Sequence, residues 1–219
     1  MAQNALPEKL PVISILCFKW DEEKPIKVAE VYNLDDFSFF QKGTIKEACL
    51  FGSRLLAART PRGSAVTVTG TANEEKGPGP LDDYITHVKV RGSDQLAITV
   101  ITAKQYPPRI ALKLMLDLES EWDKLQNQTW KSALQDTAIP FPAGEQLIKR
   151  FSNPKQNDKI FQIQDQLEQT KDIMVRNIEQ VLRRGEKIDS LVEKSDELSG
   201  FTKTFYNNSQ KLNSCCNIL

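Results

Sequence analysis

The chain has 219 residues, of which 40% are apolar and 26% are charged, and its 29 Lys and Arg residues balance 29 Asp and Glu residues. This is a globular composition, long enough for one domain and a tail. The balanced charge gives no reason to expect nucleic acid as a partner. The sequence shows no secretory signal and no apolar run of about 18 residues that could span a membrane. We therefore expect a cytoplasmic protein whose cysteines stay reduced.

Five apolar or alternating segments predict β-strands, joined mostly as hairpins. They cover residues 12–20, 26–34, 65–71, 84–91 and 96–103. The capping-box spacing from Thr44 to Glu47 predicts that a helix begins at Thr44. Pro107 and Pro108 open a second predicted helix, and residues 143–151 predict a short third one. This order predicts an α+β fold, a five-stranded antiparallel sheet flanked by helices, over residues 1–152.

Residues 153–214 predict a long coiled-coil helix. Apolar or small residues recur at alternating steps of three and four, the heptad pattern of a helix that packs against partner helices. A helix with so narrow an apolar seam is unstable without partners. The sixteen seam positions are Ile160, Ile163, Leu167, Thr170, Met174, Asn177, Val181, Arg184, Ile188, Leu191, Ser195, Leu198, Thr202, Phe205, Ser209 and Leu212.

Arg184 lies in the middle of this seam, with seven layers before it and eight after it. Burying a guanidinium in an apolar layer is costly unless acceptors surround it. Arg184 therefore predicts partner helices that supply side-chain oxygen atoms at this layer and fix the register. The alternative, an exposed arginine on an ordinary charged helix, is disfavoured by the unbroken seam on both sides.

Residues 215–219 form a candidate lipidation tail. Cys216-Asn-Ile-Leu219 fits a prenylation box, and Cys215 directly precedes it. Since one lipid chain anchors a protein only weakly, we expect two: a prenyl group at Cys216 and a palmitoyl or second prenyl group at Cys215. The terminal Leu219 favours a geranylgeranyl group over a farnesyl group. Apart from these covalent lipids, no cofactor is expected.

Five apolar residues exceed what one core face needs and are candidates for surface recognition: Phe37, Phe39, Phe40, Leu50 and Phe51. Phe51 is the strongest of them, because it lies off the core side of the first predicted helix. For Phe37 and Phe39 a place in the core under a neighbouring loop is an equal alternative.

No catalytic or metal-binding motif is present in the sequence. The single histidine, His87, has no Cys or His at ligand spacing, so we expect a partly exposed strand residue and no metal site. Cys17 and Cys49 lie within apolar patterns and are expected to be core thiols. The absence of a phosphate-binding loop and of a nucleophile with a base partner predicts a binding protein, not an enzyme.

Together these features resemble the R-SNARE family, in particular its prenylated longin-domain members that end in a CC-a-a-X box. Residues 181–188, with Arg184, resemble the family's central layer. Residues 35–41 resemble the aromatic segment before the first longin helix, and residues 213–216 resemble the lipidation site. The resemblance implies a longin (profilin-like) domain over residues 1–152 and a SNARE motif over residues 153–214.

The resemblance also implies a function. The SNARE motif would join three Q-SNARE helices in a parallel four-helix bundle and drive membrane fusion, with Arg184 facing three glutamines. The longin domain would fold back on the SNARE motif through a surface that includes Phe51, Phe39 and Phe40. The protein would then cycle between the cytoplasm and Golgi, endosomal, vacuolar or vesicle membranes, including autophagic ones. The alternative is a prenylated trafficking adaptor or tether whose heptad segment self-associates.

Overall fold

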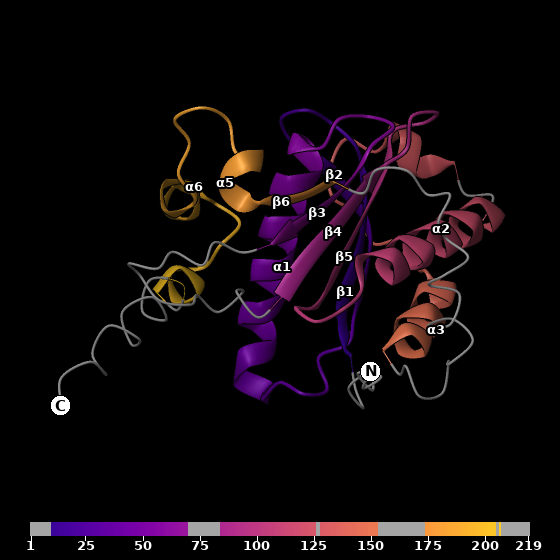
Figure 1. Ribbon diagram of the computed structural model, residues 1–219, viewed down its shortest axis with the longest axis horizontal. Helices are drawn as coiled ribbons and strands as arrows, with labels where there is room; N and C mark the ends of the chain where they lie inside the picture. The colour runs from indigo at the N-terminus through magenta and orange to yellow at the C-terminus, as the bar shows by residue number, and fades with distance from the viewer. Residues whose placement is uncertain (1–9, 70–83, 126–127, 153–173, 205, 207–219) are drawn as a thin grey trace, which may run out of the picture.

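The computed structural model describes residues 10–69, 84–125, 128–152, 174–204 and 206, and a central sheet lies between helices on its two faces (Figure 1). The strands are β1 (Val12–Lys19), β2 (Ile26–Tyr32), β3 (Ala65–Thr69), β4 (Tyr84–Val90), β5 (Leu96–Ala103) and β6 (Met174–Asn177). The helices are α1 (Phe39–Arg59), α2 (Pro108–Lys124), the 3-10 helix η1 (Thr129–Ser132), α3 (Pro142–Phe151), α5 (Ile178–Val181) and α6 (Ile188–Lys194).

The sheet has the strand order β2-β1-β5-β4-β3-β6. The five predicted strands are all present and pair antiparallel, which confirms the predicted α+β fold. Strands β1 and β5 are buried along nearly their whole length. Their near-continuous apolar sequences suit the middle of a sheet that is covered on both faces.

Helices on the two faces of the sheet enclose two separate hydrophobic cores (Figure 1). Helices α2 and α3 pack over one face and α1 packs over the other. Cys17 belongs to the core under α2 and α3, and Cys49 belongs to the core under α1. Burial raises the pKa of each thiol to about 12, which keeps both protonated and confirms that they are core thiols.

Helix α1 begins at Phe39, before the predicted start at Thr44. Ser38 is the N-cap, and its backbone N–H donates to Gln41 Oε1 at 3.0 Å. This pair has the same capping-box spacing as Thr44 and Glu47 and comes earlier in the chain. Thr44 is instead buried inside the helix, so the predicted start was wrong.

His87 is fully buried in β4, so the prediction of a partly exposed residue was wrong. Its Nδ1 atom lies 3.0 Å from Thr67 Oγ1, and its Nε2 atom lies 3.0 Å from Thr102 Oγ1. Burial lowers the pKa of His87 to about 3, which keeps the ring neutral. The lack of metal ligands near His87 in the sequence says nothing about its burial, which arises because β4 lies inside the sheet between β3 and β5, whose hydroxyl groups contact the ring.

Within its described residues, the heptad segment (residues 153–214) is not the continuous helix that its pattern predicts. Strand β6 pairs parallel with β3 at the edge of the sheet, and α5, α6 and a helical turn at residues 200–204 follow. Asn177 ends the strand and caps α5, since its Oδ1 accepts from the Gln180 N–H at 2.9 Å. Without partner helices a narrow seam cannot be buried along a straight helix, so the segment folds onto the domain instead.

Candidate functional site at the contact between helix α1 and the heptad segment

The predicted seam positions are spread over several environments in this structure. Val181, Leu198 and Thr202 are buried; Ile188, Leu191 and Ser195 are half-buried; and Met174, Asn177 and Arg184 are exposed. The other seam positions, Ile160, Ile163, Leu167, Thr170, Phe205, Ser209 and Leu212, lie outside the described residues, as do Cys215 and Cys216. Val181 packs into the core under α1, so part of the seam completes the folded domain.

The first part of the contact is one backbone ladder between two strands. Residues Met174 to Asn177 of β6 face Val66 to Thr69 of β3 in parallel register. The Thr69 hydroxyl also donates to the Arg176 carbonyl at 3.4 Å. The heptad segment therefore supplies the edge strand of the domain's own sheet, which covers backbone groups that β3 would otherwise expose.

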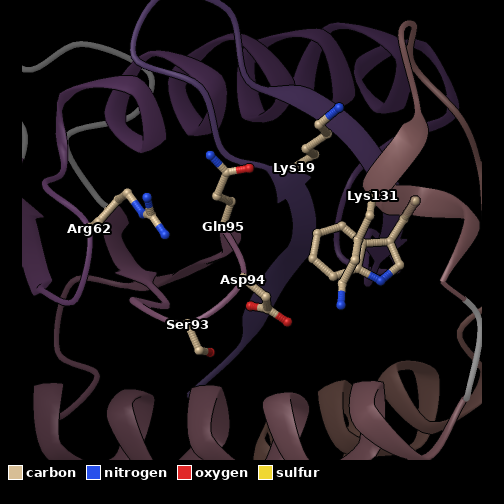
Figure 2. Close-up of a pocket in the computed structure, with 7 residues that line it drawn as sticks. Lys19, Arg62, Ser93, Asp94, Gln95 and Lys131 are labelled. Atoms are coloured by element: carbon tan, nitrogen blue, oxygen red, sulfur yellow. The ribbon is translucent and has the colours of Figure 1, made fainter.

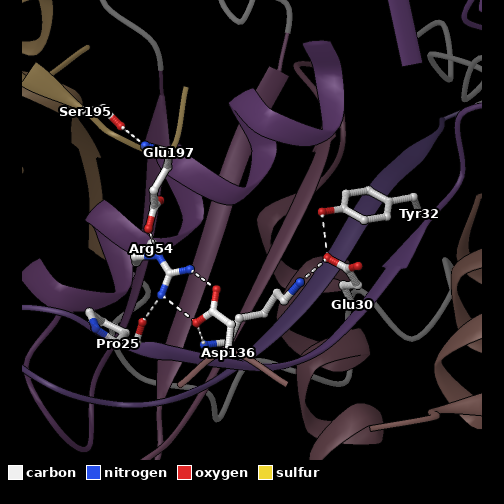
Figure 3. A network of polar contacts seen from close by, with 8 residues as sticks. Pro25, Glu30, Tyr32, Arg54, Asp136, Ser195 and Glu197 are labelled. Atoms are coloured by element: carbon white, nitrogen blue, oxygen red, sulfur yellow. Dashed lines mark hydrogen bonds and ion pairs between the residues drawn. The ribbon is translucent and has the colours of Figure 1, made fainter. Parts of the chain in front are cut away.

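Arg54 on α1 forms the central polar contact with the heptad segment (Figure 3). Its Nε atom lies 2.7 Å from Glu197 Oε1, and its Nη2 atom donates to Asp136 Oδ2 at 2.6 Å. Its Nη1 atom donates to Asp136 as well and to the Pro25 carbonyl. Burial lowers the pKa of Arg54, but the hydrogen bond to Asp136 and the charge of Glu197 outweigh it and hold the pKa above its ordinary value. A buried guanidinium needs these acceptors, and one of them comes from the heptad segment.

Two further polar contacts hold the segment along α1. At one end, Arg59 Nη2 donates to Glu186 Oε1 at 2.7 Å. At the other end, Glu47 Oε2 accepts from the Thr202 hydroxyl at 2.6 Å and from the Ser199 N–H at 2.9 Å. Burial raises the pKa of Glu47, and these hydrogen bonds together lower it below its usual range.

The predicted aromatic surface lies partly on this helix. Phe39 and Phe40 are 84% and 87% exposed, and their rings meet edge to face with centroids 5.8 Å apart. Phe51 is half-buried. Phe37 and Leu50 are half-buried and pack against the core under α1, so these two complete the core. A role of Phe51, Phe39 and Phe40 in closure stays a prediction.

The polar residues that hold the contact were missed by sequence reasoning. Glu186, Glu197 and Ser199 lie between seam positions, where charged and polar side chains are expected on any solvated helix. Arg54 and Glu47 are seven residues apart on α1, a spacing that places them on one helix face. That spacing was the available signal, but nothing in the sequence indicated what this face binds.

Taken together, the arrangement holds one segment on the domain by a strand pair, a buried ion pair and flanking hydrogen bonds. Arg184, the central seam residue, takes no part in this contact and is exposed. Within the described residues, no helix has both the length and the apolar character needed to cross a bilayer.

Comparison with known proteins finds similar sequences over both the folded domain and the heptad segment. A family model described as Synaptobrevin matches residues 159–217. The VAMP-like protein YKT61 of Arabidopsis thaliana is 32% identical over 211 residues, covering 96% of this chain and 100% of the relative. The synaptobrevin homolog ykt6 of Schizosaccharomyces pombe is 34% identical over 95% of this chain and 98% of the relative. The putative synaptobrevin homolog YKT6 of Dictyostelium discoideum is 34% identical over 88% of this chain and 91% of the relative.

These similarities extend over the folded domain and the heptad segment together, and the family that they define is not an enzymatic one. The chain therefore belongs to the longin-domain R-SNARE family of synaptobrevin homologues, which acts in vesicle trafficking.

Proposed function

We propose that this R-SNARE drives membrane fusion by joining three Q-SNARE helices in a parallel four-helix bundle, and that the folded-back structure is its stored form. The observation that carries the proposal is that residues of the predicted coiled-coil seam lie in a strand in this structure. Met174 and Asn177 are seam positions of the predicted coiled coil, yet here they lie in an extended strand paired with β3.

The two states exclude one another for a physical reason. A residue cannot adopt strand and helix backbone angles at once. Strand β6 must therefore separate from β3 before Met174 and Asn177 can become helical and pack against the Q-SNARE helices. Leu198 and Thr202 are likewise buried against the domain and would need to be released. Binding to Q-SNARE helices therefore competes with the intramolecular contact, and each weakens the other.

Arg184 has a defined place in this proposal. In the stored form it is exposed, which avoids the cost of burying an unpaired guanidinium. In the bundle it would lie in the central layer, where three glutamine side chains supply the oxygen acceptors. It would then fix the register of the four helices, as buried polar residues do in coiled coils.

Lipidation at Cys216 and Cys215 completes the proposed cycle. A prenyl group at Cys216 alone would bind membranes weakly and reversibly, and a palmitoyl or second prenyl group at Cys215 would hold the open form there. The protein would move between the cytoplasm and Golgi, endosomal, vacuolar or vesicle membranes, including autophagic ones. Phe51→Glu should shift the lipidated chain toward membranes if Phe51 supports closure, and an unchanged distribution would exclude that role.

The test is to mix residues 153–214 with three Q-SNARE helices and to record helicity by circular dichroism. We expect a stable helical complex, and we expect the full chain to form it more slowly than the segment does. Arg184→Ala should lower the melting temperature of the complex more than Arg183→Ala, which changes the neighbouring off-seam arginine. If no complex forms with Q-SNARE helices, the proposal fails, and self-association of the segment alone would favour a tether.

A further inference from the structure

A cleft of about 310 Å³ lies at the end of the sheet where β1 ends and β4 turns into β5, and no residue of the heptad segment is among its lining residues. Four separate parts of the chain line it, as Figure 2 shows: the end of β1, the turn after α1, the β4–β5 turn and η1. The lining residues are Lys19, Arg62, Ser93, Asp94, Gln95, Trp130 and Lys131.

Three cations converge on this cleft, and none of them is paired with a carboxylate among the described residues. Lys19 Nζ donates to the Ala133 carbonyl at 3.0 Å, and Arg62 Nη2 donates to the Gly92 carbonyl at 2.8 Å. Lys131 Nζ lies 5.6 Å from the centroid of the Trp130 ring. A carbonyl or a ring face orients a cation without neutralising its charge, and both Lys and Arg retain further donors.

Some cations elsewhere on the same domain are paired with carboxylates. Lys89 lies 2.5 Å from Glu119, and Arg59 lies 2.7 Å from Glu186. The one carboxylate in the cleft, Asp94, is held from outside by Arg91, with contacts of 2.8 and 2.5 Å. Burial raises the pKa of Asp94, but the contacts with Arg91 and, to a smaller extent, the charge of Lys131 lower it below its ordinary value. With three cations and one carboxylate among its lining residues, the cleft keeps a net positive charge.

The walls of the cleft are fixed before any ligand arrives. Gln95 has a φ of 67°, a left-handed conformation that is rare for a residue with a side chain, and its carbonyl accepts from the Trp20 N–H at 2.7 Å. The Gly63 N–H donates to the Val90 carbonyl at 2.8 Å, which holds the Arg62 turn against the end of β4. A binding site whose groups are already in place loses less entropy when it binds.

We propose that this cleft binds a phosphate monoester, either on a small phosphorylated molecule or on a lipid headgroup. A phosphate monoester carries about −1.5 to −2 charges at neutral pH and several acceptor oxygens, which matches two ammonium groups, a guanidinium and the Ser93 hydroxyl better than a single carboxylate does. The volume of about 310 Å³ is at the lower end for small-molecule sites, so it suits a phosphorylated ring or short chain rather than a polymer.

The test uses the full chain produced without lipid, so that an inserted acyl or prenyl chain cannot account for membrane binding. Calorimetry measures binding of inositol trisphosphate and of inorganic phosphate. Sedimentation measures binding to phosphatidylcholine vesicles that contain phosphatidylinositol bisphosphate. The comparison uses phosphatidylcholine vesicles in which phosphatidylserine supplies the same total negative charge. The variants are Arg62→Gln and Lys131→Gln, singly and together. The control is Lys104→Gln, which removes an exposed lysine just beyond the other end of β5.

We expect each cleft variant to weaken binding by roughly tenfold, the double variant to weaken it further, and the control to bind like the original chain. Binding to soluble probes without vesicle binding would assign a free phosphorylated molecule, and binding to phosphoinositide vesicles above the phosphatidylserine level would assign a headgroup. Absence of saturable binding, or equal binding by the double variant at an unchanged melting temperature, would overturn the proposal. Because Lys131 is an exposed residue of the short helix η1, Lys131→Gln alone serves as the test if the double variant unfolds.

Discussion

Glu197→Gln should open the stored form without disturbing the folded domain. The substitution keeps the side-chain shape and removes the charge that faces Arg54, whose other acceptors, Asp136 and the Pro25 carbonyl, remain in place. The variant therefore tests one contact between the domain and the heptad segment. The guanidinium stays hydrogen-bonded, so the substitution leaves no unpaired buried charge.

The magnitude follows from the burial of the pair. Arg54 and Glu197 lie 2.7 Å apart with side chains 9% and 28% exposed. Fully exposed ion pairs contribute about 0–1 kcal/mol, and hydrogen bonds to charged groups about 1.5–3 kcal/mol. We therefore expect the contact between Arg54 and Glu197 to stabilise the closed form by about 1–2 kcal/mol. Loss of that free energy raises the ratio of open to closed chains by a factor of about 5–30.

Hydrogen exchange followed by mass spectrometry measures this ratio locally. Amides of β6 and α6 exchange through opening of the segment, so their exchange rates should rise by the same factor, whereas peptides from β1 and β5 should be unchanged. The matched control is Glu179→Gln, which neutralises an exposed carboxylate on α5. Equal exchange in the two variants would refute the reasoning, and faster exchange in β1 and β5 as well would show a general loss of stability instead.

Three further predictions test the fold and the competition between the two states. His87 has a folded pKa of about 3 against an ordinary 6.5, so the unfolded chain binds more protons between these values and stability should fall as the pH is lowered through that window. Carboxylates whose pKa is lowered in the folded chain, such as Glu47 and Asp136, add to this loss at the acidic end, so urea unfolding should show a smaller loss of stability in His87→Gln than in the original chain, and an equal loss would contradict the role of His87. Gly144→Ala should lower the free energy of unfolding by about 1–3 kcal/mol in chemical denaturation, because an added Cβ would lie 2.7 Å from a ring carbon of Phe141. Gly52→Ala, with open space around the added Cβ in α1, should raise it by about 0.5–1 kcal/mol. Val192→Ala should speed hydrogen exchange in the heptad segment, because Val192 is only 1% exposed here, but should leave the melting temperature of a Q-SNARE complex unchanged, because Val192 is not a seam position. The control is Val175→Ala, which changes an exposed residue that is also off the seam. A lower melting temperature for the complex of Val192→Ala alone would contradict the assignment of the seam.

The folded domain could be predicted from sequence because its signals are local. The apolar run of β1, the alternation in β3 and the proline pair before α2 each specify an element without knowledge of the rest of the chain. Local signals also explain the error at α1, where two capping boxes of equal spacing compete. The burial of His87 could not be predicted, because it depends on which strands flank β4 and on hydroxyl groups from β3 and β5.

The heptad segment shows a different limit of sequence reasoning. Its seam correctly indicated a segment that needs partners, but periodicity describes only the state in which helices are the partners. In the stored form the partner is a sheet edge and the outer face of α1, and the backbone of Met174 to Asn177 follows the edge. Neither the strand nor the role of Arg54 could be derived from one chain's periodicity, because both depend on tertiary contacts.

The polar contacts of the stored form lie mainly at positions that the bundle does not use. Glu186, Glu197 and Ser199 are off the seam, so in a four-helix bundle they would face water, where charged and polar side chains carry little cost. Apolar residues in their place would strengthen closure but leave an exposed apolar face on the bundle. Polar contacts avoid this, and their individual strength of about 1–2 kcal/mol is small enough for zippering to displace them. Thr202 is shared between the two sets, since it contacts Glu47 here and belongs to the seam. The segment can therefore specify two structures because most of the polar residues that hold the folded-back form lie off the seam, although several seam residues, such as Val181 and Leu198, are buried in it as well.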